Sequence, residues 1–149
     1  MLVKDICTLD AVSCGRDTNI LEAARLMRLH HTGDLIIVDD PQGDRTPVGI
    51  VTDRDIVVEV LAAERDPATT RVSGIMPARL VIASAAEDVA EAVERMRLHG
   101  VRRLPVVDHD GSLLGIVTLD DILTLHAGQA ATLAAIVAKE QTREQRSRR

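Results

Sequence analysis

Apolar positions along the chain follow two different periods. A short apolar stretch at 11–13 precedes a segment whose apolar residues recur every three or four positions, which predicts an amphipathic helix. The apolar face of that helix consists of Ile20, Ala23, Ala24 and Met27. Two short runs rich in branched residues follow, at 35–39 and 48–52, and predict two strands joined by a turn. A second helix is expected to begin at Asp53.

The same pattern occurs again further along the chain. An apolar stretch at 80–83 precedes a second amphipathic segment with the same spacing. Its apolar face consists of Val89, Ala92, Val93 and Met96. Two strands are expected at 104–108 and 113–118, and a helix is expected to begin at Leu119.

The two copies align residue by residue. N-I-L-E-A-A-R-L-M-R-L-H at 19–30 lies over D-V-A-E-A-V-E-R-M-R-L-H at 88–99, an offset of 69 residues. G-I-V-T-x-x-D occurs at 49–55 and again at 115–121, an offset of 66 residues. The offset changes within the turn between the two strands, where a change of length is tolerated. The chain therefore contains an internal repeat.

The repeat predicts an α/β fold made of two β-α-β-β-α units. Each unit is too small to bury its apolar face alone, so we expect the units to pack face to face about a pseudo-two-fold axis. The expected parts are a first repeat at 1–62, a polar linker at 63–71, a second repeat at 72–126, and a C-terminal helix with a basic tail at 127–149. The C-terminal helix is expected at about 130–141, after Gly128.

Composition and charge narrow the possible partners. The chain contains no Phe, Trp or Tyr, so its core must be aliphatic, and base stacking on aromatic side chains is excluded. A net charge of -5 argues against duplex DNA or an anionic membrane as the main partner. The basic residues of 139–149 indicate a solvated, frayed tail, although a role as a nucleic-acid accessory protein through this tail stays open as an alternative.

The spacing of the cysteines and the first residues of the sequence indicate the cellular compartment in which we expect the protein. Cys7 and Cys14 do not form a C-x-x-C pair, and no charged stretch followed by an apolar one marks a secretory signal. We therefore expect a cytoplasmic protein with reduced thiols. Apolar runs such as 35–38 and 55–63 are shorter than the ~20 residues that cross a bilayer, so no membrane span is expected. The histidines lack the spacing of zinc ligands, and no metal site is expected.

The repeated motif carries the candidate chemistry. Thr52 and Asp55 stand where a strand is expected to give way to a helix, and Thr118 and Asp121 repeat this arrangement. One interpretation is a helix cap, in which both side chains accept free backbone N–H groups. Another is ligand binding, because a carboxylate matches the two vicinal hydroxyls of a ribose and a helix start favours phosphate. Both roles can hold at once.

The pieces in this order resemble a known family. An I-C or I-M pair, an E-A-x-x-x-M helix, V-R-R-L-P-V-V-D at 101–108, a turn and G-I-V-T-x-x-D resemble the cystathionine β-synthase (CBS) domain pair, or Bateman module, over residues 3–126. T-D-R-D-I-V-V and D-P-A-T-T-R-V are similar to small stand-alone bacterial pairs of the signal-transduction or hypoxic-response type. The resemblance implies a non-catalytic regulatory homodimer. It would bind AMP, ADP, ATP, NAD or S-adenosylmethionine between its two halves as a regulatory ligand, with no catalytic cofactor.

The resemblance also implies the ligand contacts. Asp55 and Asp121 would hold the ribose, with Thr52 and Thr118 beside them, and Arg102 and Arg103 would reach phosphates. The further matched positions are Gly49, Ile50, Leu80, Val81, Ile82, Pro105, Val12 and Ser13. The first repeat has Gly33 and Asp34 where the second has the two arginines. We therefore expect unequal clefts. The Asp55 cleft would face Arg102 and Arg103 and prefer phosphorylated ligands, whereas the Asp121 cleft would face Gly33 and Asp34 and bind adenosine-like or cationic ligands, hold a dinucleotide differently, or stay empty.

An enzyme is the alternative from a different class. A small hydrolase or phosphotransferase would bind Mg²⁺ through loop carboxylates, namely Asp39, Asp40, Asp53 and Asp55. However, the sequence shows no activated nucleophile, no G-x-x-x-x-G-K-[ST] loop and no paired histidines. We therefore expect no enzymatic activity.

Overall fold

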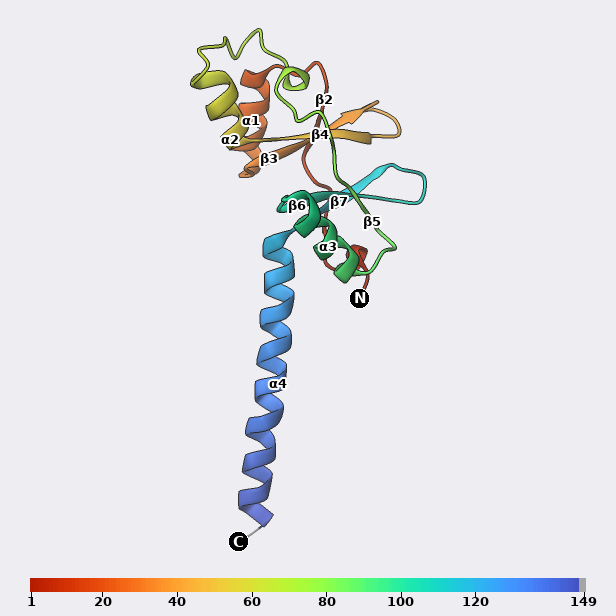
Figure 1. Cartoon of the computed structure of the whole chain (residues 1–149), viewed down its shortest axis with the longest axis vertical. Helices are drawn as coiled ribbons and strands as arrows, with labels where there is room; N and C mark the ends of the chain where they lie inside the picture. Colours follow the sequence, from red (N-terminus) through yellow and green to blue (C-terminus); the bar gives the residue numbers. More distant parts are fainter. Residues whose placement is uncertain (148–149) are drawn as a thin grey trace.

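Two β-sheets, one in each half, form the centre of the globular part of the computed structural model, which describes residues 1–147 (Figure 1). The three-stranded sheet has the order β2 (Ser13–Gly15), β3 (Asp34–Asp39), β4 (Thr46–Thr52). The four-stranded sheet has the order β1 (Thr8–Leu9), β7 (Leu113–Thr118), β6 (Arg103–Val107), β5 (Ala83–Ser84). In each sheet a parallel pair, β2 with β3 or β5 with β6, precedes an antiparallel hairpin.

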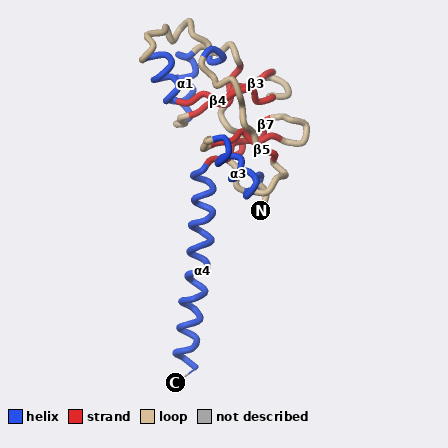
Figure 2. Tube along the Cα trace, viewed as in Figure 1, coloured by secondary structure: helices blue, strands red, loops and turns tan. Residues whose placement is uncertain are grey.

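The helices follow the strands in the order that the repeat predicts (Figure 2). They are α1 (Ile20–His30), α2 (Asp53–Ile56) with a π-helical extension (Val57–Leu61), α3 (Val89–His99), α4 (Leu119–Ser147), and two short 3-10 helices at Val3–Asp5 and Val72–Gly74. Asn19 and Asp88 cap α1 and α3, each accepting a backbone N–H with its side chain. The α/β class with two β-α-β-β-α units is confirmed.

Strand β3 shows why its apolar run is continuous rather than alternating. Leu35 and Ile37 face the core of the first half, whereas Ile36 and Val38 pack against Leu113 and Ile116 of the second half. Because both faces of β3 are covered, every position from 35 to 38 is buried. This second contact joins the two halves through their sheets.

The opening segments of the two repeats are exchanged in space. Val3 lies in the core of the second half, where its N–H donates to the carbonyl of Glu87, 3.0 Å away. Val72 lies in the core of the first half, where its N–H donates to the carbonyl of Thr18, 2.8 Å away. Each half is therefore completed by the first residues of the other sequence repeat.

Helix α4 corrects the expected end of the chain. A separate C-terminal helix was predicted at about 130–141, but one continuous helix runs from Leu119 to Ser147 (Figure 1). Gly128 costs a helix only about 1 kcal/mol relative to alanine. The surrounding alanines and leucines are strong helix formers, so the helix continues through it. The predicted frayed tail is wrong for residues 139–147, which are helical, and 148–149 lie outside the described residues.

Replacing Gly128 with alanine should stabilise α4. A Cβ at Gly128 would meet no atom within 4 Å, so the new methyl group costs no contact. Alanine removes the extra backbone freedom of glycine, and we expect about 0.5–1 kcal/mol of helix stability. Far-ultraviolet circular dichroism on mild heating would show a later loss of helix. An unchanged or earlier loss would mean that the helix depends on a bend at this position.

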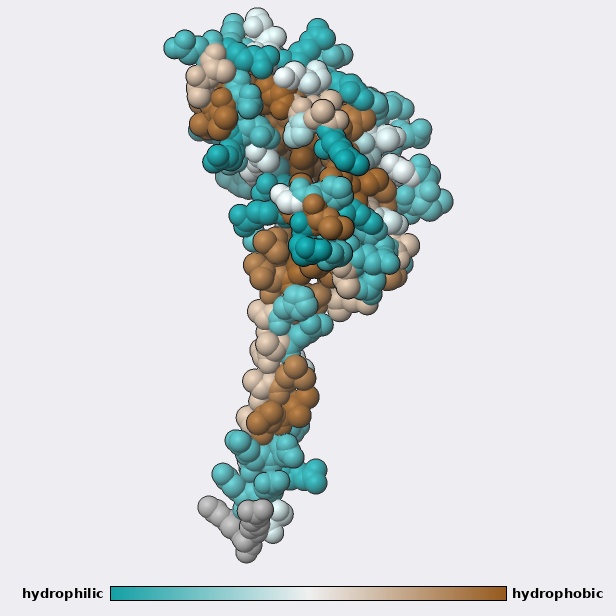
Figure 3. Space-filling model, in the orientation of Figure 1, coloured by the Kyte–Doolittle hydropathy of each residue, from teal (hydrophilic) through white to brown (hydrophobic). Residues whose placement is uncertain are grey.

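Helix α4 is also apolar and exposed. Figure 3 shows apolar side chains midway along the projecting helix, before a hydrophilic end, and Leu133, Ile136 and Val137 are 65%, 59% and 54% exposed. One 18-residue window of this helix has a mean hydropathy of 1.3, so it meets the length and composition of a membrane span. The expectation of no membrane span rested on shorter apolar runs. Helix α4 begins inside the fold, however, where Ile122 joins the core of the second half.

Candidate functional site

Thr52 and Asp55 form a reciprocal cap at the start of α2. The N–H of Thr52 donates to Oδ2 of Asp55 over 2.8 Å, and the N–H of Asp55 donates to Oγ1 of Thr52 over 3.2 Å. The cap forms because β4 ends at Thr52 and α2 begins at the next residue. The helix-cap interpretation is thus confirmed for this motif. Oδ1 of Asp55 accepts no hydrogen bond from residues 1–147, so one carboxylate oxygen is free for a ligand.

Thr118 and Asp121 repeat the cap at the start of α4. The N–H and the hydroxyl of Thr118 both donate to Oδ2 of Asp121, over 2.8 and 2.9 Å. The N–H of Asp121 lies 3.3 Å from Oγ1 of Thr118. Oδ1 of Asp121 again accepts no hydrogen bond within the described residues. Both motifs therefore present the same arrangement, whereas the ribose-binding role of the aspartates stays a prediction.

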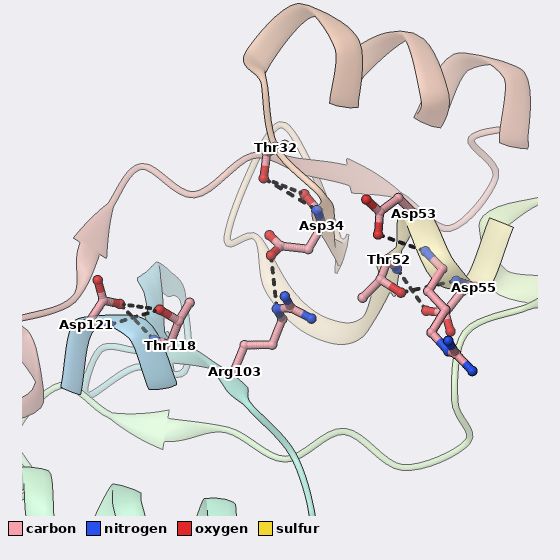
Figure 4. A network of polar contacts seen from close by, with 9 residues as sticks. Thr32, Asp34, Thr52, Asp53, Asp55, Arg103, Thr118 and Asp121 are labelled. Carbon is pink, nitrogen blue, oxygen red and sulfur yellow. Dashed lines mark hydrogen bonds and ion pairs between the residues drawn. The ribbon is translucent and has the colours of Figure 1, made fainter. Parts of the chain in front are cut away.

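An ion pair between the two halves lies between these caps. Nε of Arg103 is 3.1 Å from Oδ2 of Asp34, and Figure 4 shows the pair between the two Thr–Asp motifs. Asp34 begins β3 opposite Thr52, and Arg103 begins β6 opposite Thr118. Sequence comparison assigned these charges to separate clefts. The structure joins them in one contact, so neither is an unpaired charge within residues 1–147.

The geometry of this ion pair is incomplete. Nε of Arg103 is shielded from solvent and has no aligned hydrogen-bond acceptor among residues 1–147. The pKa of Asp34 is raised because burial disfavours its charge, and this effect outweighs the attraction of Arg103 and a hydrogen bond with Thr32. The Asp53 carboxylate raises it further. The pair therefore only partly compensates the burial of the carboxylate.

Arg102 lies at a different part of the surface from the Arg103–Asp34 ion pair. It is exposed and borders a hollow of about 350 Å³ between α3 and α4, together with Arg97 and Leu119. Asp55 does not line this hollow. The structure therefore does not bring the two predicted phosphate-binding arginines to one place, and Arg103 is the one that reaches the first half.

The stretch expected to contact adenine lies beside basic residues that the sequence interpretation missed. Leu80, Val81 and Ile82 border a hollow of about 390 Å³. The charged and polar residues around it are Arg79, Ser84, Glu87, Arg95 and His99. Arg95 donates to the carbonyl of Ile82 over 2.9 Å and pairs with Glu87. Arg95 and His99 are four residues apart on α3, a spacing that could have indicated a shared face.

The remaining predicted positions have structural contacts. Oγ of Ser13 accepts a hydrogen bond from Arg45 over 3.1 Å, and Val12 packs against the first core. Ile50 packs between the sheets, and Pro105 is buried in β6. A ligand-binding role for these residues stays a prediction.

Gly49 and Gly115 occupy the same place in the repeated motif, where another segment approaches closely. A Cβ on Gly49 would lie 2.5 Å from Sδ of Met76, and one on Gly115 would collide with the backbone of Thr8. The glycines therefore leave room for the exchanged opening segments. A ligand-binding role for Gly49 stays a prediction.

The carboxylates of the alternative enzyme do not converge. Asp39 lies at one end of the β3–β4 ladder, opposite Thr46, and Asp55 follows the other end, about 20 Å away at strand spacing. Asp39 forms an ion pair with Arg16. Within residues 1–147, one group has the spacing of metal ligands, the exposed 108–110 turn, which contains none of these carboxylates. A shared Mg²⁺ site is therefore not formed.

A large hollow runs along α4. It has a volume of about 890 Å³ and is open to solvent. Its lining residues are Ile6, Asp121, Thr124, Leu125, Gly128, Gln129, Thr132 and Leu133. Asp121, in the first turn of α4, therefore borders this hollow, whereas Asp55 does not, so the two motifs differ in their surroundings although their caps match.

Comparison with known proteins identifies the family. The CBS domain model matches residues 3–62 and 72–128. The chain is 35% identical over 119 residues to Hypoxic response protein 1 of Mycobacterium tuberculosis, covering 80% of each chain.

Comparison with solved structures indicates the same family. A crystal structure of Hypoxic Response Protein I with two coordinated zinc ions matches with a TM-score of 0.74 and 34% identity, over 83% of this chain and 98% of that one. The CBS domain pair of protein MJ0100, in complex with 5'-methylthioadenosine and S-adenosyl-L-methionine, matches with a TM-score of 0.74 and 31% identity, over 87% and 98%. The resemblance seen in the repeated motifs is confirmed, and the chain belongs to the CBS domain family and carries a pair of CBS domains.

Proposed function

We propose that this chain is a regulatory module that binds an adenosine-containing ligand between its two halves and has no catalytic activity. The observation that carries the proposal is the pair of Thr–Asp motifs, each with one carboxylate oxygen free, on either side of the Arg103–Asp34 pair (Figure 4). A free carboxylate oxygen accepts hydrogen bonds from ribose hydroxyls, and a guanidinium binds phosphate.

The MJ0100 pair supports an adenosine moiety as the common feature of the ligand. Both of its named ligands, 5'-methylthioadenosine and S-adenosyl-L-methionine, contain adenosine and lack phosphate. AMP, ADP, ATP and NAD share the adenosine and add phosphates, for which Arg103 is the candidate contact. The physiological ligand therefore belongs to the adenosine class, and its charge is the property to determine.

Isothermal titration calorimetry with this panel tests the proposal. We expect at least one ligand to bind, and we expect no turnover of ATP over hours with added Mg²⁺. Binding without turnover supports a sensor, whereas steady hydrolysis supports the enzyme. Intrinsic fluorescence is of no use here because the chain has no Trp or Tyr.

We also propose a homodimer in which helices of both halves, extended by α4, pack against those of a second copy. Large apolar side chains are exposed on α1, the α2 extension and α3 as well as on α4; those on the first three are Leu21, Leu29, Val57, Val58, Leu61, Val93 and Leu98. Exposed apolar side chains mark an interaction surface when they form one contiguous patch. Light scattering at high micromolar concentration should give the mass of a dimer or a larger assembly. A strictly monomeric mass would contradict the proposal.

If α4 contributes to that interface, replacing Ile136 with aspartate should weaken association. Ile136 is 59% exposed on the single chain, so the change removes apolar contact area without disturbing a core. We expect a dimer dissociation constant about tenfold higher or more by sedimentation. Gln145→Asp, further along the same helix, is the matched control. Equal effects of the two changes would point to net charge rather than to the apolar face.

A further inference from the structure

We infer that Asp34 determines ligand specificity by competing with a ligand phosphate for Arg103, so that it weakens binding of phosphorylated ligands and leaves uncharged adenosine compounds unaffected. The inference rests on the proposed function, because it concerns the same proposed ligand site. It assigns to Asp34 a role opposite to that of a direct ligand contact.

The Arg103–Asp34 ion pair lies beside the motif that contains Asp55. Asp34 lies opposite Thr52 in the β3–β4 ladder, so it is adjacent to the motif that contains Asp55. Arg103 comes from β6 of the other half and reaches across to within 3.1 Å of Asp34. Arg102 borders the hollow between α3 and α4 instead. Arg103 is therefore the cation that a phosphate bound beside Asp55 would meet, and Asp34 already engages it (Figure 4).

Within residues 1–147, the Arg103–Asp34 ion pair leaves one hydrogen-bond donor of Arg103 unsatisfied. The buried Nε–H of Arg103 has no aligned acceptor among residues 1–147, although the Asp34 carboxylate is close. A phosphate offers several oxygens and binds a guanidinium through two parallel hydrogen bonds. A phosphate can thus satisfy Arg103 better than Asp34 does. To reach Arg103, however, the phosphate must approach the partly buried carboxylate of Asp34 and separate it from its partner. The negative charges of the phosphate and the carboxylate then oppose binding at short range.

The consequence is selection by charge. A phosphorylated ligand gains a contact with Arg103 only by displacing Asp34, whereas adenosine makes no use of Arg103. The net attraction available to phosphate is therefore smaller than the arginine alone would supply. Sequence comparison placed Asp34 and Arg103 in opposite clefts; as one ion pair they instead set the charge preference of the proposed ligand site beside Asp55.

Asp34→Asn tests the inference, because asparagine keeps the shape of the side chain and removes its charge. Calorimetric titration of AMP and of adenosine should show AMP binding about tenfold tighter than in the wild type, with adenosine within about twofold. Asp34→Ser removes the same charge with a smaller side chain and should show the same selective gain. The control is Asp53→Asn, which removes a neighbouring carboxylate that has no contact with Arg103 and should change AMP affinity less than about threefold.

A double variant tests whether Asp34 acts through Arg103. Arg103→Ala should weaken AMP binding, and adding Asp34→Asn to it should restore less than about threefold, because no arginine is left to release. If Asp34→Asn tightens AMP binding as much in the Arg103→Ala background as in the wild-type background, the inference is overturned in favour of a general charge effect. An equal gain from Asp53→Asn would lead to the same conclusion. Unchanged AMP affinity in Asp34→Asn, with adenosine still bound, would overturn the inference and leave the proposed function standing. If neither compound binds to the wild type or to any variant, the inference fails, whereas the proposed function is decided by the rest of the ligand panel.

Discussion

Replacing Asp55 with alanine should weaken adenine-nucleotide binding at least about tenfold and cost only about 1 kcal/mol of stability. The stability loss is that of a helix cap, because Oδ2 of Asp55 accepts the N–H of Thr52. The loss of binding follows from the free Oδ1 atom, since charge-assisted hydrogen bonds to a ribose contribute roughly 1.5–3 kcal/mol. Calorimetry measures the first effect and urea unfolding the second.

Two related variants separate the two roles of the aspartate. Asp55→Asn keeps an oxygen that can accept the N–H of Thr52, so it should retain most of the stability while still losing affinity. Asp121→Ala makes the same change in the other motif, where the cap is equivalent. Unchanged affinity together with a lowered melting temperature in Asp55→Ala would assign the motif to helix capping alone.

Gly115→Ala should destabilise the fold by about 2–3 kcal/mol, within the range for overpacking a closely packed site. A Cβ at Gly115 would collide with the carbonyl oxygen of Thr8 and lie 3.2 Å from Cα of Leu9. Both contacts are backbone atoms of β1, which pairs with β7 at this position. Strand β1 must therefore shift, and the exchanged opening segment loses contacts with the second half.

Gly49→Ala is the matched variant, because Gly49 holds the same place in the first motif. Its Cβ would press against the side chain of Met76, which is flexible and can change rotamer. We therefore expect a smaller cost, below about 1.5 kcal/mol. Urea unfolding of both variants gives the comparison. A loss in Gly49→Ala equal to or greater than that in Gly115→Ala would show that backbone contact with β1 is not what limits the site.

The repeat made much of the fold predictable. Identical spacing of apolar residues in two copies, with a Thr-x-x-Asp motif at each strand-to-helix junction, was enough for the element order and for both caps. The exchange of the opening segments was not predictable, because Val3 and Val72 are apolar residues that would suit either core. Only the three-dimensional arrangement decides which half they complete.

The charged residues of the site were found in sequence but misplaced in part. Alignment showed that Asp34 and Arg103 occupy matching positions, yet spacing along a chain does not say that two such positions meet across a pseudo-two-fold axis. Arg79 was missed because it lies outside the repeated motifs, and Arg95 was missed because its counterpart in the first repeat is Leu26; both meet the 80–82 stretch only through packing. The extent of α4 was misjudged because a single glycine was given more weight than its helix-forming neighbours.

The most direct measurement is a calorimetric titration of AMP, ATP, adenosine and S-adenosylmethionine into the wild-type chain and into the Asp55→Asn/Asp121→Asn double variant. Circular dichroism would first establish that the double variant is folded. We predict that at least one of these ligands binds the wild type and that its affinity falls at least about tenfold in the folded double variant. Absence of binding by every ligand, or equal binding by the wild type and the double variant, would contradict the proposal that the two Thr–Asp motifs form an adenosine-binding site.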